Sequence, residues 1–457
     1  MVIKTINPIT EEIIQEFKEN TFEDIDLALN NSKHAQKEWF SKSKEKRISI
    51  MQNMKKSFEK NQNDLINTIH EECGIDKDEV QDVIYDIFDG FDYYIEKYSK
   101  LENINFPINQ EVFPESTSTI QFYPLGVIVQ IGAWNYPLWQ TTISVIPALL
   151  TGNSIIYKPS EKSIKVGLLI SKVINSTKDF PKNLFIPIIG DSEQGKYLVK
   201  SNVDAVIYTG NIKTGLDIIK NSGTKPKILE LSGNDAAIVC KDCNMDQAIE
   251  GIAGGAFFHS GQVCDRIKRI YVVKEIADEF IEKLISRISI IREKITPLIS
   301  EDSLKIVDSQ IKQTVKDGAE ILIGGKRFNK KGFYYEPTLL KLKHNNVYSV
   351  KNEIFGPVAS LLIVNSEEEA IKFANSTEFG LGTSIWTQNF EKANKIANQC
   401  ETGMIWINDS NIPLVCGEYF KGWKSTSIPN ANDRLSMFLK SKTIISFNSK
   451  NRRTWWY

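Results

Sequence analysis

The sequence predicts an α/β protein with a mainly parallel sheet. From residue 125 onward, short apolar runs alternate with helical stretches, and this alternation is typical of parallel sheets. A second strand–helix unit begins after residue 244 and continues to about residue 415. The strand candidates of the first unit are GVIVQIG, NSIIYKPS, LFIPIIG, DAVIYTG, KILELSG and DAAIVC.

The first hundred residues are polar and periodic at helical spacing. Thr21 is placed to cap a first helix, and a second helical pattern ends at Gly74. A third amphipathic pattern follows in VQDVIYDIFDGFDYYIEKYSKL. Residues 103–124 turn to β-type residues, which predicts an extended hairpin or arm.

Composition excludes several classes of protein. The 457 residues are 41% hydrophobic and 25% charged, as in an ordinary globular protein of two or three domains. A formal net charge of −1 gives no electrostatic reason to expect nucleic acid or an anionic membrane as partner. Six cysteines in so long a chain do not make a disulfide framework. The N-terminal stretch lacks the apolar core of a signal peptide, and polar residues, glycines and prolines interrupt the apolar region 126–157, so we expect a cytoplasmic protein without a membrane span.

Motifs for metal and phosphate binding are weak. Cys240 and Cys243 form a C-x-x-C, but the other cysteines are solitary and the four histidines show no ligand spacing, so no metal site is expected. No G-x-G-x-x-G follows a strand. Two strand–glycine–helix turns, IIGDSEQGKYLV and IYTGNIKTG, could each present a helix N-terminus to a phosphate.

Three residues become informative together. Asn135 lies in a stretch without charged side chains, residues 126–157, where a buried amide needs a hydrogen-bond partner. Glu230 ends the strand candidate KILE, and Cys264 follows in a small-residue turn. A thiolate nucleophile, an amide donor for an oxyanion and a carboxylate base are the parts that acyl chemistry requires. Each residue alone is also compatible with a packed thiol, a satisfied core amide or a solvated acid.

Seven short motifs in a fixed order resemble the aldehyde dehydrogenase superfamily: WNYP, KPSE, YTGN, ELSGND, GQVC, EIFGPV and FGLGTSIWT. The resemblance covers the chain to about residue 445. It implies a Rossmann-like dinucleotide-binding domain (1–102 and 125–232), a second α/β catalytic domain (233–420) and a small β oligomerisation arm with the C-terminal segment (103–124 and 421–457). It also implies a homodimer or homotetramer.

The resemblance assigns roles to residues of this chain. Cys264 is the expected nucleophile. Asn135 and the backbone N–H of Cys264 are expected to form the oxyanion hole, and Glu230 is the expected base that activates water. The expected cofactor is NAD, with NADP possible, because a carboxylate at Glu161 accepts hydrogen bonds from ribose hydroxyls and repels a 2′-phosphate. Residues expected at the cofactor are Lys158 and Glu161 at the adenosine ribose, Gly210 and Asn211 at the pyrophosphate, Trp134 in the cleft, and Glu353 and Phe355 at the nicotinamide riboside.

The implied reaction oxidises an aldehyde to a carboxylic acid with NAD(P)⁺ through a thiohemiacetal and a thioester on Cys264. The expected tunnel residues Tyr136, Trp139, Gln140, Ile143 and Phe420 include no Lys or Arg, which disfavours a carboxylate-bearing substrate. Aromatic and aliphatic walls favour a neutral, fairly apolar aldehyde, although Tyr136 and Trp139 could also face a cation. The sequence offers no account of the acidic residue that follows the nucleophile.

Three alternatives remain open at this stage. One is an impaired relative that serves as a binding or structural protein, and another is a semialdehyde-specific dehydrogenase. A third, a CoA-acylating or phosphate-dependent reductase, has no use for Glu230. Departures from the family pattern lie at Asn211, Ser232 and the loop YFKGWKSTS, where flanking glycines are missing.

Overall fold

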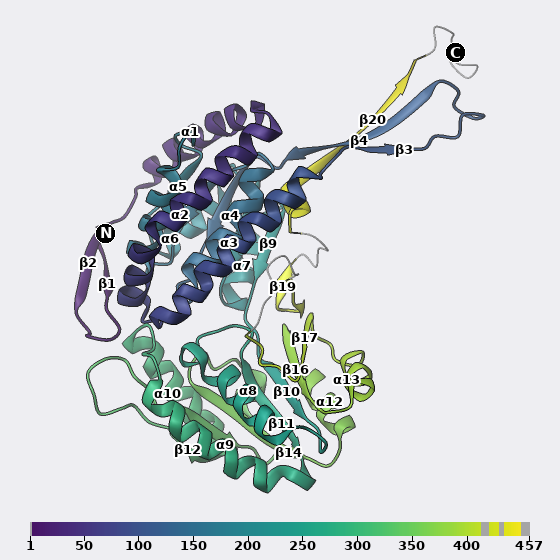
Figure 1. The fold of residues 1–457 in the computed structure, drawn as a ribbon. Coiled ribbons are helices and arrows are strands. Elements are labelled where there is room, and N and C mark those ends of the chain that lie inside the picture. The colour runs from purple at the N-terminus through teal and green to yellow at the C-terminus, as the bar shows by residue number, and fades with distance from the viewer. Residues whose placement is uncertain (1, 413–419, 429–433, 449–457) are drawn as a thin grey trace.

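The computed structural model describes residues 2–412, 420–428 and 434–448. Two bodies, each a sheet covered by helices, lie one above the other, and a narrow β arm projects from the first (Figure 1). The predicted α/β class is confirmed. Among the described residues, no helix has the length and apolar character needed to cross a bilayer.

The first body contains a six-stranded sheet in the order β19-β9-β8-β5-β6-β7. All neighbours are parallel except the C-terminal β19, which pairs antiparallel with β9. Strand β5 lies between β6 and β8, so the chain order reverses beside it, and ligands of such sheets bind at the carboxyl ends of the strands at this point. The strands are β5 (Val127–Ile131), β6 (Ser154–Lys158), β7 (Phe185–Pro187), β8 (Ala205–Thr209), β9 (Lys227–Glu230) and β19 (Ser427–Ile428).

The helices of this body in the described part of the chain are α1 (Phe22–Ser41), α2 (Lys44–Cys73), α3 (Lys77–Ser99), α4 (Pro137–Leu150), α5 (Ile164–Asn175), α6 (Ser192–Lys200) and α7 (Ile212–Asn221). The three predicted N-terminal helices are α1 to α3. Thr21 accepts a hydrogen bond from the Asp24 N–H in a capping box, and Gly74 ends α2 in the left-handed conformation at φ 70°. An N-terminal hairpin of β1 (Val2–Ile6) and β2 (Ile13–Lys18) was not anticipated.

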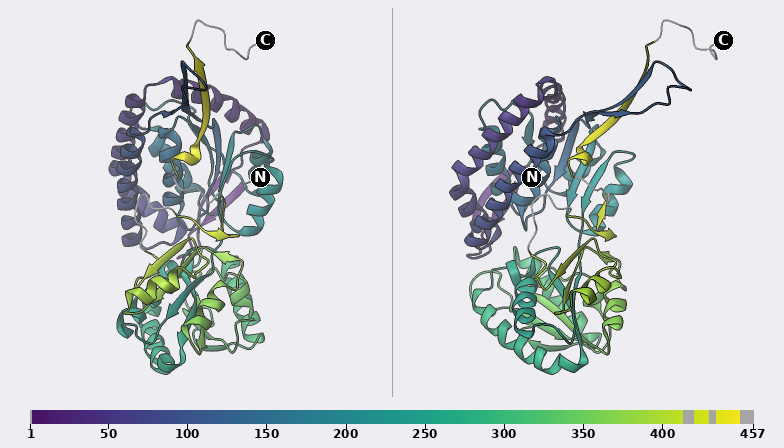
Figure 2. Two further views of the ribbon diagram at one scale, coloured as in Figure 1. Left: turned by 90° about the vertical axis from the view of Figure 1, so that its right-hand side faces the viewer. Right: turned by 45° about the vertical axis from the view of Figure 1, so that its right-hand side comes forward.

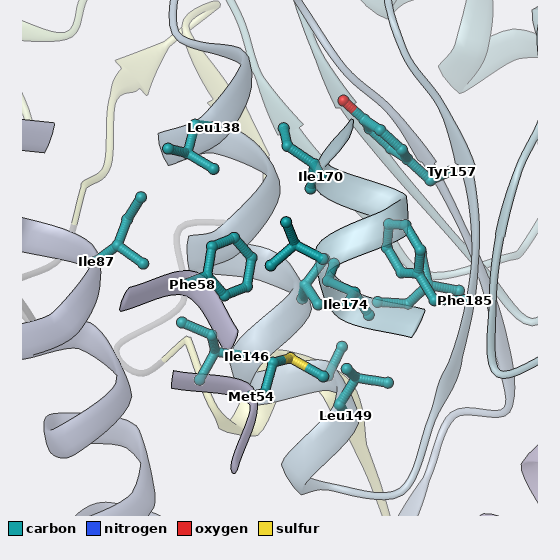
Figure 3. Close-up of a cluster of buried hydrophobic side chains, with 14 of the residues drawn as sticks. Met54, Phe58, Ile87, Leu138, Ile146, Leu149, Tyr157, Ile170, Ile174 and Phe185 are labelled. Atoms are coloured by element: carbon teal, nitrogen blue, oxygen red, sulfur yellow. The ribbon is translucent and has the colours of Figure 1, made fainter. Parts of the chain in front are cut away.

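The core of this body fixes helix α4, which carries residues expected to line the substrate tunnel. Figure 3 shows apolar side chains from two long helices meeting α4, α5 and the sheet. Tight packing at this junction leaves α4 little freedom to move, because shifting it would open voids among fully buried groups. The labelled side chains are Met54, Phe58, Ile87, Leu138, Ile146, Leu149, Tyr157, Ile170, Ile174 and Phe185.

The second body contains a seven-stranded sheet in the order β12-β13-β14-β11-β10-β16-β17, parallel except for β12. Its strands are β10 (Asp235–Val239), β11 (Ile267–Val273), β12 (Glu320–Ile323), β13 (Thr338–Lys341), β14 (Val358–Val364), β16 (Gly382–Trp386) and β17 (Met404–Ile407). Its helices are α8 (Met245–Phe257), α9 (Ala277–Ile291), α10 (Glu301–Lys316), α11 (Tyr348–Lys351), α12 (Glu367–Asn375) and α13 (Phe390–Ala397). Short β15 (Phe379–Gly380) and β18 (Trp423–Lys424) pair separately.

The arm is a three-stranded antiparallel sheet in the order β20-β4-β3. It joins β3 (Ile104–Phe106) and β4 (Ser116–Pro124) to the C-terminal β20 (Leu439–Phe447), and all nine residues of β20 are paired with β4. Both views of Figure 2 show the arm extending away from the two bodies. Such a sheet has two edge strands whose backbone groups lack a partner strand within the described chain.

Candidate active site

A cleft of about 1920 Å³ is lined by residues of both bodies. All but one of the residues named from the sequence line it: Cys264, Glu230, Asn135, Trp134, Lys158, Glu161, Gly210, Asn211, Glu353, Phe355, Tyr136, Trp139, Gln140 and Phe420. The exception, Ile143, is half-buried one helical turn beyond Trp139 on α4 and is not part of the wall. Residues 135, 230 and 264 therefore meet at one cavity.

Cys264 lies in a loop with unusual backbone geometry. His259 and Ser260 have φ of 45° and 52°, and Gly261 follows at 67°, so three consecutive residues adopt the left-handed region. The fully buried Arg266 side chain holds this loop, donating from Nε to the Gly261 carbonyl at 2.6 Å and from Nη2 to the Ile354 carbonyl at 2.6 Å. The loop is thus anchored to the second body immediately beside the thiol.

The surroundings of the Cys264 thiol favour its protonated form. Burial, followed by the negative charge of Asp265, raises the pKa of the Cys264 thiol well above its usual range. Its Sγ lies 3.8 Å from Asp265 Oδ1. A proton must therefore leave the sulfur before it can act as a nucleophile.

The Asn135 amide is held at both ends. Its Oδ1 accepts a hydrogen bond from Gln140 Nε2 at 2.8 Å, and its Nδ2 donates to the Gln262 carbonyl at 3.0 Å. Because an NH₂ group carries two hydrogens, one N–H remains for a ligand in the cleft. Asn135 follows the carboxyl end of β5. It belongs to residues 126–157, the stretch without charged side chains noted in the sequence, and it lines the cleft.

Glu230 ends β9 and is ion-paired with Arg434. Their side chains are only 8% and 10% exposed. The C-terminal segment reaches this position because β19 adds to the sheet next to β9, with Ser427 opposite Glu230. The pairing was missed in the sequence because Arg434 is 204 residues away along the chain and no local pattern links the two.

The first-body half of the cleft has the features of a dinucleotide site. Lys158 ends β6 almost fully buried, where burial lowers the pKa of its ammonium group, and Glu161 lines the cleft beside it. Asn211 caps α7 through a 2.9 Å bond from the Thr214 N–H to its Oδ1, which leaves the helix N-terminus facing the cleft. A Cβ on Gly210 would lie 2.2 Å from the Tyr208 hydroxyl, so a larger residue at this turn would displace the Tyr208 side chain.

The remaining expected cofactor residues come from both bodies: Trp134 follows β5 of the first body, and Glu353 and Phe355 belong to the second. The rings of Trp134 and Phe355 meet edge to face at 5.7 Å between centroids. Glu353 Oε1 is 3.1 Å from Lys268 Nζ, which also donates to the Cys264 carbonyl at 2.5 Å. These residues connect β5 to the Cys264 loop along the cleft. The carboxylate of Glu161 and the open N-terminus of α7 are groups that bind the ribose and phosphates of a dinucleotide, so the site fits NAD(P).

The end of the cleft near Tyr136 carries acidic residues that were not predicted. Glu79, Asp82 and Asp86 share one face of α3 and line the cleft. Burial raises the pKa of Glu79 to about 8. Asp86 keeps an exposed part, and its partial burial, followed by the charges of Asp89 and Asp82, raises its pKa to about 6. The spacing of acids in DEVQDVIYD was visible in the sequence, but nothing there placed α3 against the tunnel.

Aromatic rings line the same end. Trp139 and Phe420 meet edge to face at 5.5 Å, and Tyr136 meets His259 in the same way at 5.5 Å. The Tyr136 hydroxyl donates to Glu79. The aromatic side chains anticipated from the sequence therefore line the cleft, together with the carboxylates of α3.

A separate cluster of Cys240, Asp242 and Glu367 could hold a cation by geometry alone. Lys392 Nζ already lies 3.0 Å from both carboxylates, so an ammonium group supplies the counter-charge there. Cys240 and Cys243 are free thiols.

Comparison with known proteins agrees with this geometry. Residues 1–444 match the aldehyde dehydrogenase family. Betaine aldehyde dehydrogenase of Bacillus subtilis is 32% identical, and the match covers 88% of this chain and 85% of that protein. Peroxisomal aminoaldehyde dehydrogenase 1 of Pisum sativum is 30% identical, and the match covers 89% of this chain and 84% of that protein.

Solved structures are similar over nearly the whole chain. Betaine aldehyde dehydrogenase of Staphylococcus aureus in complex with NAD⁺ has a TM-score of 0.95 at 28% identity, covering 100% of this chain and 93% of that one. An NADP complex of glyceraldehyde-3-phosphate dehydrogenase from Methanocaldococcus jannaschii has a TM-score of 0.91 at 27% identity, covering 97% and 99%. This chain therefore belongs to the aldehyde dehydrogenase family and is an NAD(P)-dependent oxidoreductase.

Proposed function

We propose that the enzyme oxidises aldehydes that carry a positively charged amine or quaternary ammonium group. The observation that carries this proposal is the set of three carboxylates on α3 at the aldehyde end of the cleft. Several relatives support it, since their names specify betaine aldehyde, 4-trimethylaminobutyraldehyde and aminoaldehyde.

Charge complementarity is the physical basis. Asp82 and Asp86 are exposed on α3, and the residues described at this end of the cleft include no Lys or Arg. A cation a few ångströms from a carboxylate gains a few kcal/mol at most in a partly solvated site. The faces of Trp139, Phe420 and Tyr136 attract an alkylammonium group further, by about 0.5–2 kcal/mol each.

The chain's residues have distinct roles in the proposed reaction. The Cys264 sulfur adds to the aldehyde carbon, and the oxyanion that forms accepts hydrogen bonds from the Asn135 amide and the Cys264 N–H. Bound NAD⁺ supplies the hydride acceptor. Glu230 then takes a proton from water, which attacks the thioester and releases the carboxylic acid.

The cofactor preference follows from Glu161. Its carboxylate favours hydrogen bonds with the 2′ and 3′ hydroxyls and repels a 2′-phosphate, so we expect a higher kcat/KM with NAD than with NADP. Glu161→Gln removes the repulsion, and its ratio of the two kcat/KM values should move toward NADP. A wild-type enzyme that prefers NADP contradicts this part of the proposal.

Substrate charge is tested with isosteric pairs. Betaine aldehyde and 3,3-dimethylbutanal differ in a nitrogen and a positive charge but hardly in shape, and both are assayed by NADH formation. We expect kcat/KM to be at least tenfold higher for the cation, a difference of about 1.4 kcal/mol. Equal or higher values for 3,3-dimethylbutanal would favour the neutral, apolar substrate class expected from the sequence.

Single variants locate the charge effect. Asp82→Asn and Asp86→Asn each should lower kcat/KM for betaine aldehyde about three- to tenfold and leave 3,3-dimethylbutanal unaffected, as loss of a long-range ion pair predicts. Asp89→Asn, on the same helix but outside the lining, is the matched control. No NADH from any aldehyde would instead support a binding or structural role.

The arm supports a homo-oligomer. Phe106 and Ile445 on its strands are 52% and 67% exposed, and its edge strands offer unpaired backbone groups. We propose that a second copy of the chain covers this sheet. Light scattering on the wild-type protein and on Ile445→Lys tests it, since the variant should dissociate, and a monomeric wild type contradicts it.

A further inference from the structure

Asp265 is a buried acid that directly follows Cys264 and has no part in the reaction described so far. It is 4% exposed and lines the cleft. Its Oδ1 lies 3.8 Å from the Cys264 Sγ, within reach of a hydrogen bond from the larger sulfur atom. The carboxylate and the reacting sulfur are therefore in direct contact.

The groups around Asp265 leave it free to exchange a proton with the thiol. The titratable and charged groups that act on it are Lys268 on β11, Cys264, Glu230 at the end of β9, Asp235 on β10 and Tyr136 before α4. The ammonium group of Lys268 is already engaged by Glu353 and by two loop carbonyls, and it forms no ion pair with Asp265 among the described residues. Burial raises the pKa of Asp265 to about 6.

The other carboxylate of the site is engaged elsewhere. Glu230 is paired with Arg434, a side chain brought in by the C-terminal segment. Its carboxylate is thus held toward the C-terminal segment, whereas the thiol's own hydrogen-bond partner is Asp265. Two proton transfers, one from the thiol and one from water, then have two separate acceptors.

We propose that Asp265 is the base that takes the proton from the Cys264 thiol. The S–H bond breaks toward Asp265 Oδ1 as sulfur forms its bond to the aldehyde carbon, and the carbonyl π electrons move onto oxygen. When the carbonyl carbon–sulfur bond later breaks, Asp265 returns that proton to sulfur, while the proton from water goes to Glu230 and on to solvent. The carboxylate is unchanged after one turnover.

Electrostatics favours one shared proton in this pair. Two adjacent anions in a buried site repel each other, so ionised Asp265 next to a thiolate is disfavoured, and one of the two groups keeps the proton. Moving that proton from sulfur to carboxylate leaves the net charge unchanged. The thiolate can then form within the closed site without a proton crossing to solvent.

The test measures the burst of NADH in the first turnover, before thioester hydrolysis. Propanal is the substrate because it is neutral, so the result does not depend on the proposed preference for cationic aldehydes. Asp265→Asn should slow the burst about 10²- to 10³-fold at pH 7, in the range of general base catalysis. Its rate should then rise about tenfold per pH unit up to pH 9, since hydroxide must replace the base, whereas the wild-type rate levels off above about pH 6.

A purely electrostatic role gives the opposite sign. If Asp265 only repels the thiolate, its removal lowers the thiol's pKa and speeds the burst at pH 7, which would overturn the proposal. An unchanged burst with a wild-type pH profile would overturn it as well. Asp89→Asn removes a carboxylate that lies outside the cleft lining and should keep the wild-type burst.

Chemical rescue separates a missing base from a damaged site. Asp265→Ala leaves space for a small carboxylate, so added formate should restore the burst in a saturable way, and the same concentration of chloride should not. Thermal melting and NAD binding establish that the variants are folded. If folded Asp265→Ala shows no rescue and its pH profile keeps the wild-type plateau, Asp265 is a structural residue and the proposal fails.

Discussion

The carboxylate of Glu230 and the guanidinium of Arg434 form an ion pair in which both side chains are at most 10% exposed. A strand of the first body thereby depends on a residue of the C-terminal segment, which also supplies β19 and β20. Arg434 Nη1 lies 3.4 Å from the Ser144 hydroxyl on α4, so the pair is fixed between the sheet and the tunnel helix. We propose that Arg434 positions Glu230, the proposed base.

Arg434→Met tests this role. Without its ion-pair partner the nearly buried Glu230 carboxylate is no longer held in place, so thioester hydrolysis should slow. Steady-state NADH formation should fall at least tenfold, whereas the first-turnover burst remains. Arg287→Met, which breaks the more exposed pair with Glu250, is the control and should leave both phases as in wild type. Loss of the burst together with the steady state would contradict this account.

Asn135→Ala tests the oxyanion donor. Removing one such donor costs about 10²- to 10³-fold in rate, so the burst should slow by that factor while the NAD affinity stays constant. Gln140→Met removes the bond that orients the amide and should have a smaller effect of the same kind. A burst within twofold of wild type in Asn135→Ala contradicts the assignment.

Substrate binding should depend on pH through the acids of α3. The pKa of Asp86 is about 6 and that of Glu79 about 8, so the tunnel mouth gains negative charge between pH 5 and pH 9. We expect KM for betaine aldehyde to fall across this range and KM for 3,3-dimethylbutanal to stay flat. Glu79→Gln should abolish the fall in KM for betaine aldehyde above pH 7. If KM for the two substrates varied with pH in the same way, the explanation would be refuted.

His259 should make the protein sensitive to acid. Its two ring nitrogens have no partner among the described residues, and burial lowers the pKa of His259 to about 3. Because the unfolded chain binds a proton near pH 6.5 that the folded chain does not, stability from this residue is lost as pH falls from 6.5 toward 3. Each pH unit costs about 1.4 kcal/mol.

The matched variant is His259→Asn, which cannot titrate and tolerates the residue's left-handed backbone. The difference in melting temperature between pH 7 and pH 5 should shrink in the variant by the equivalent of about 2 kcal/mol. Parallel pH curves for the two proteins would show that His259 is not responsible.

Local patterns predicted much of the fold. Alternating strands and helices, the Thr21 cap and the Gly74 terminator are each determined by neighbours in sequence, and all appear as expected. The order of short motifs likewise indicated which residues line the cleft, with Ile143 as the exception.

Long-range pairings could not be predicted in this way. Tertiary packing decides three features that leave no periodic signal in the sequence. They are the ion pair of Arg434 with Glu230, the position of the α3 acids in the cleft lining, and the N-terminal hairpin. Asp265 was conspicuous in the sequence, but only its contact with the Cys264 sulfur gives it a chemical role.

The most direct test of the account is to trap the covalent intermediate. Glu230→Gln removes the base for water, so incubation with NAD⁺ and betaine aldehyde followed by acid quench should leave the acyl group on the enzyme. We predict that peptide mass spectrometry finds close to one acyl group per chain, on Cys264, and none in Cys264→Ser. An adduct on another cysteine, or NADH formation that continues in Cys264→Ser, would contradict the central claim that this thiol carries the substrate.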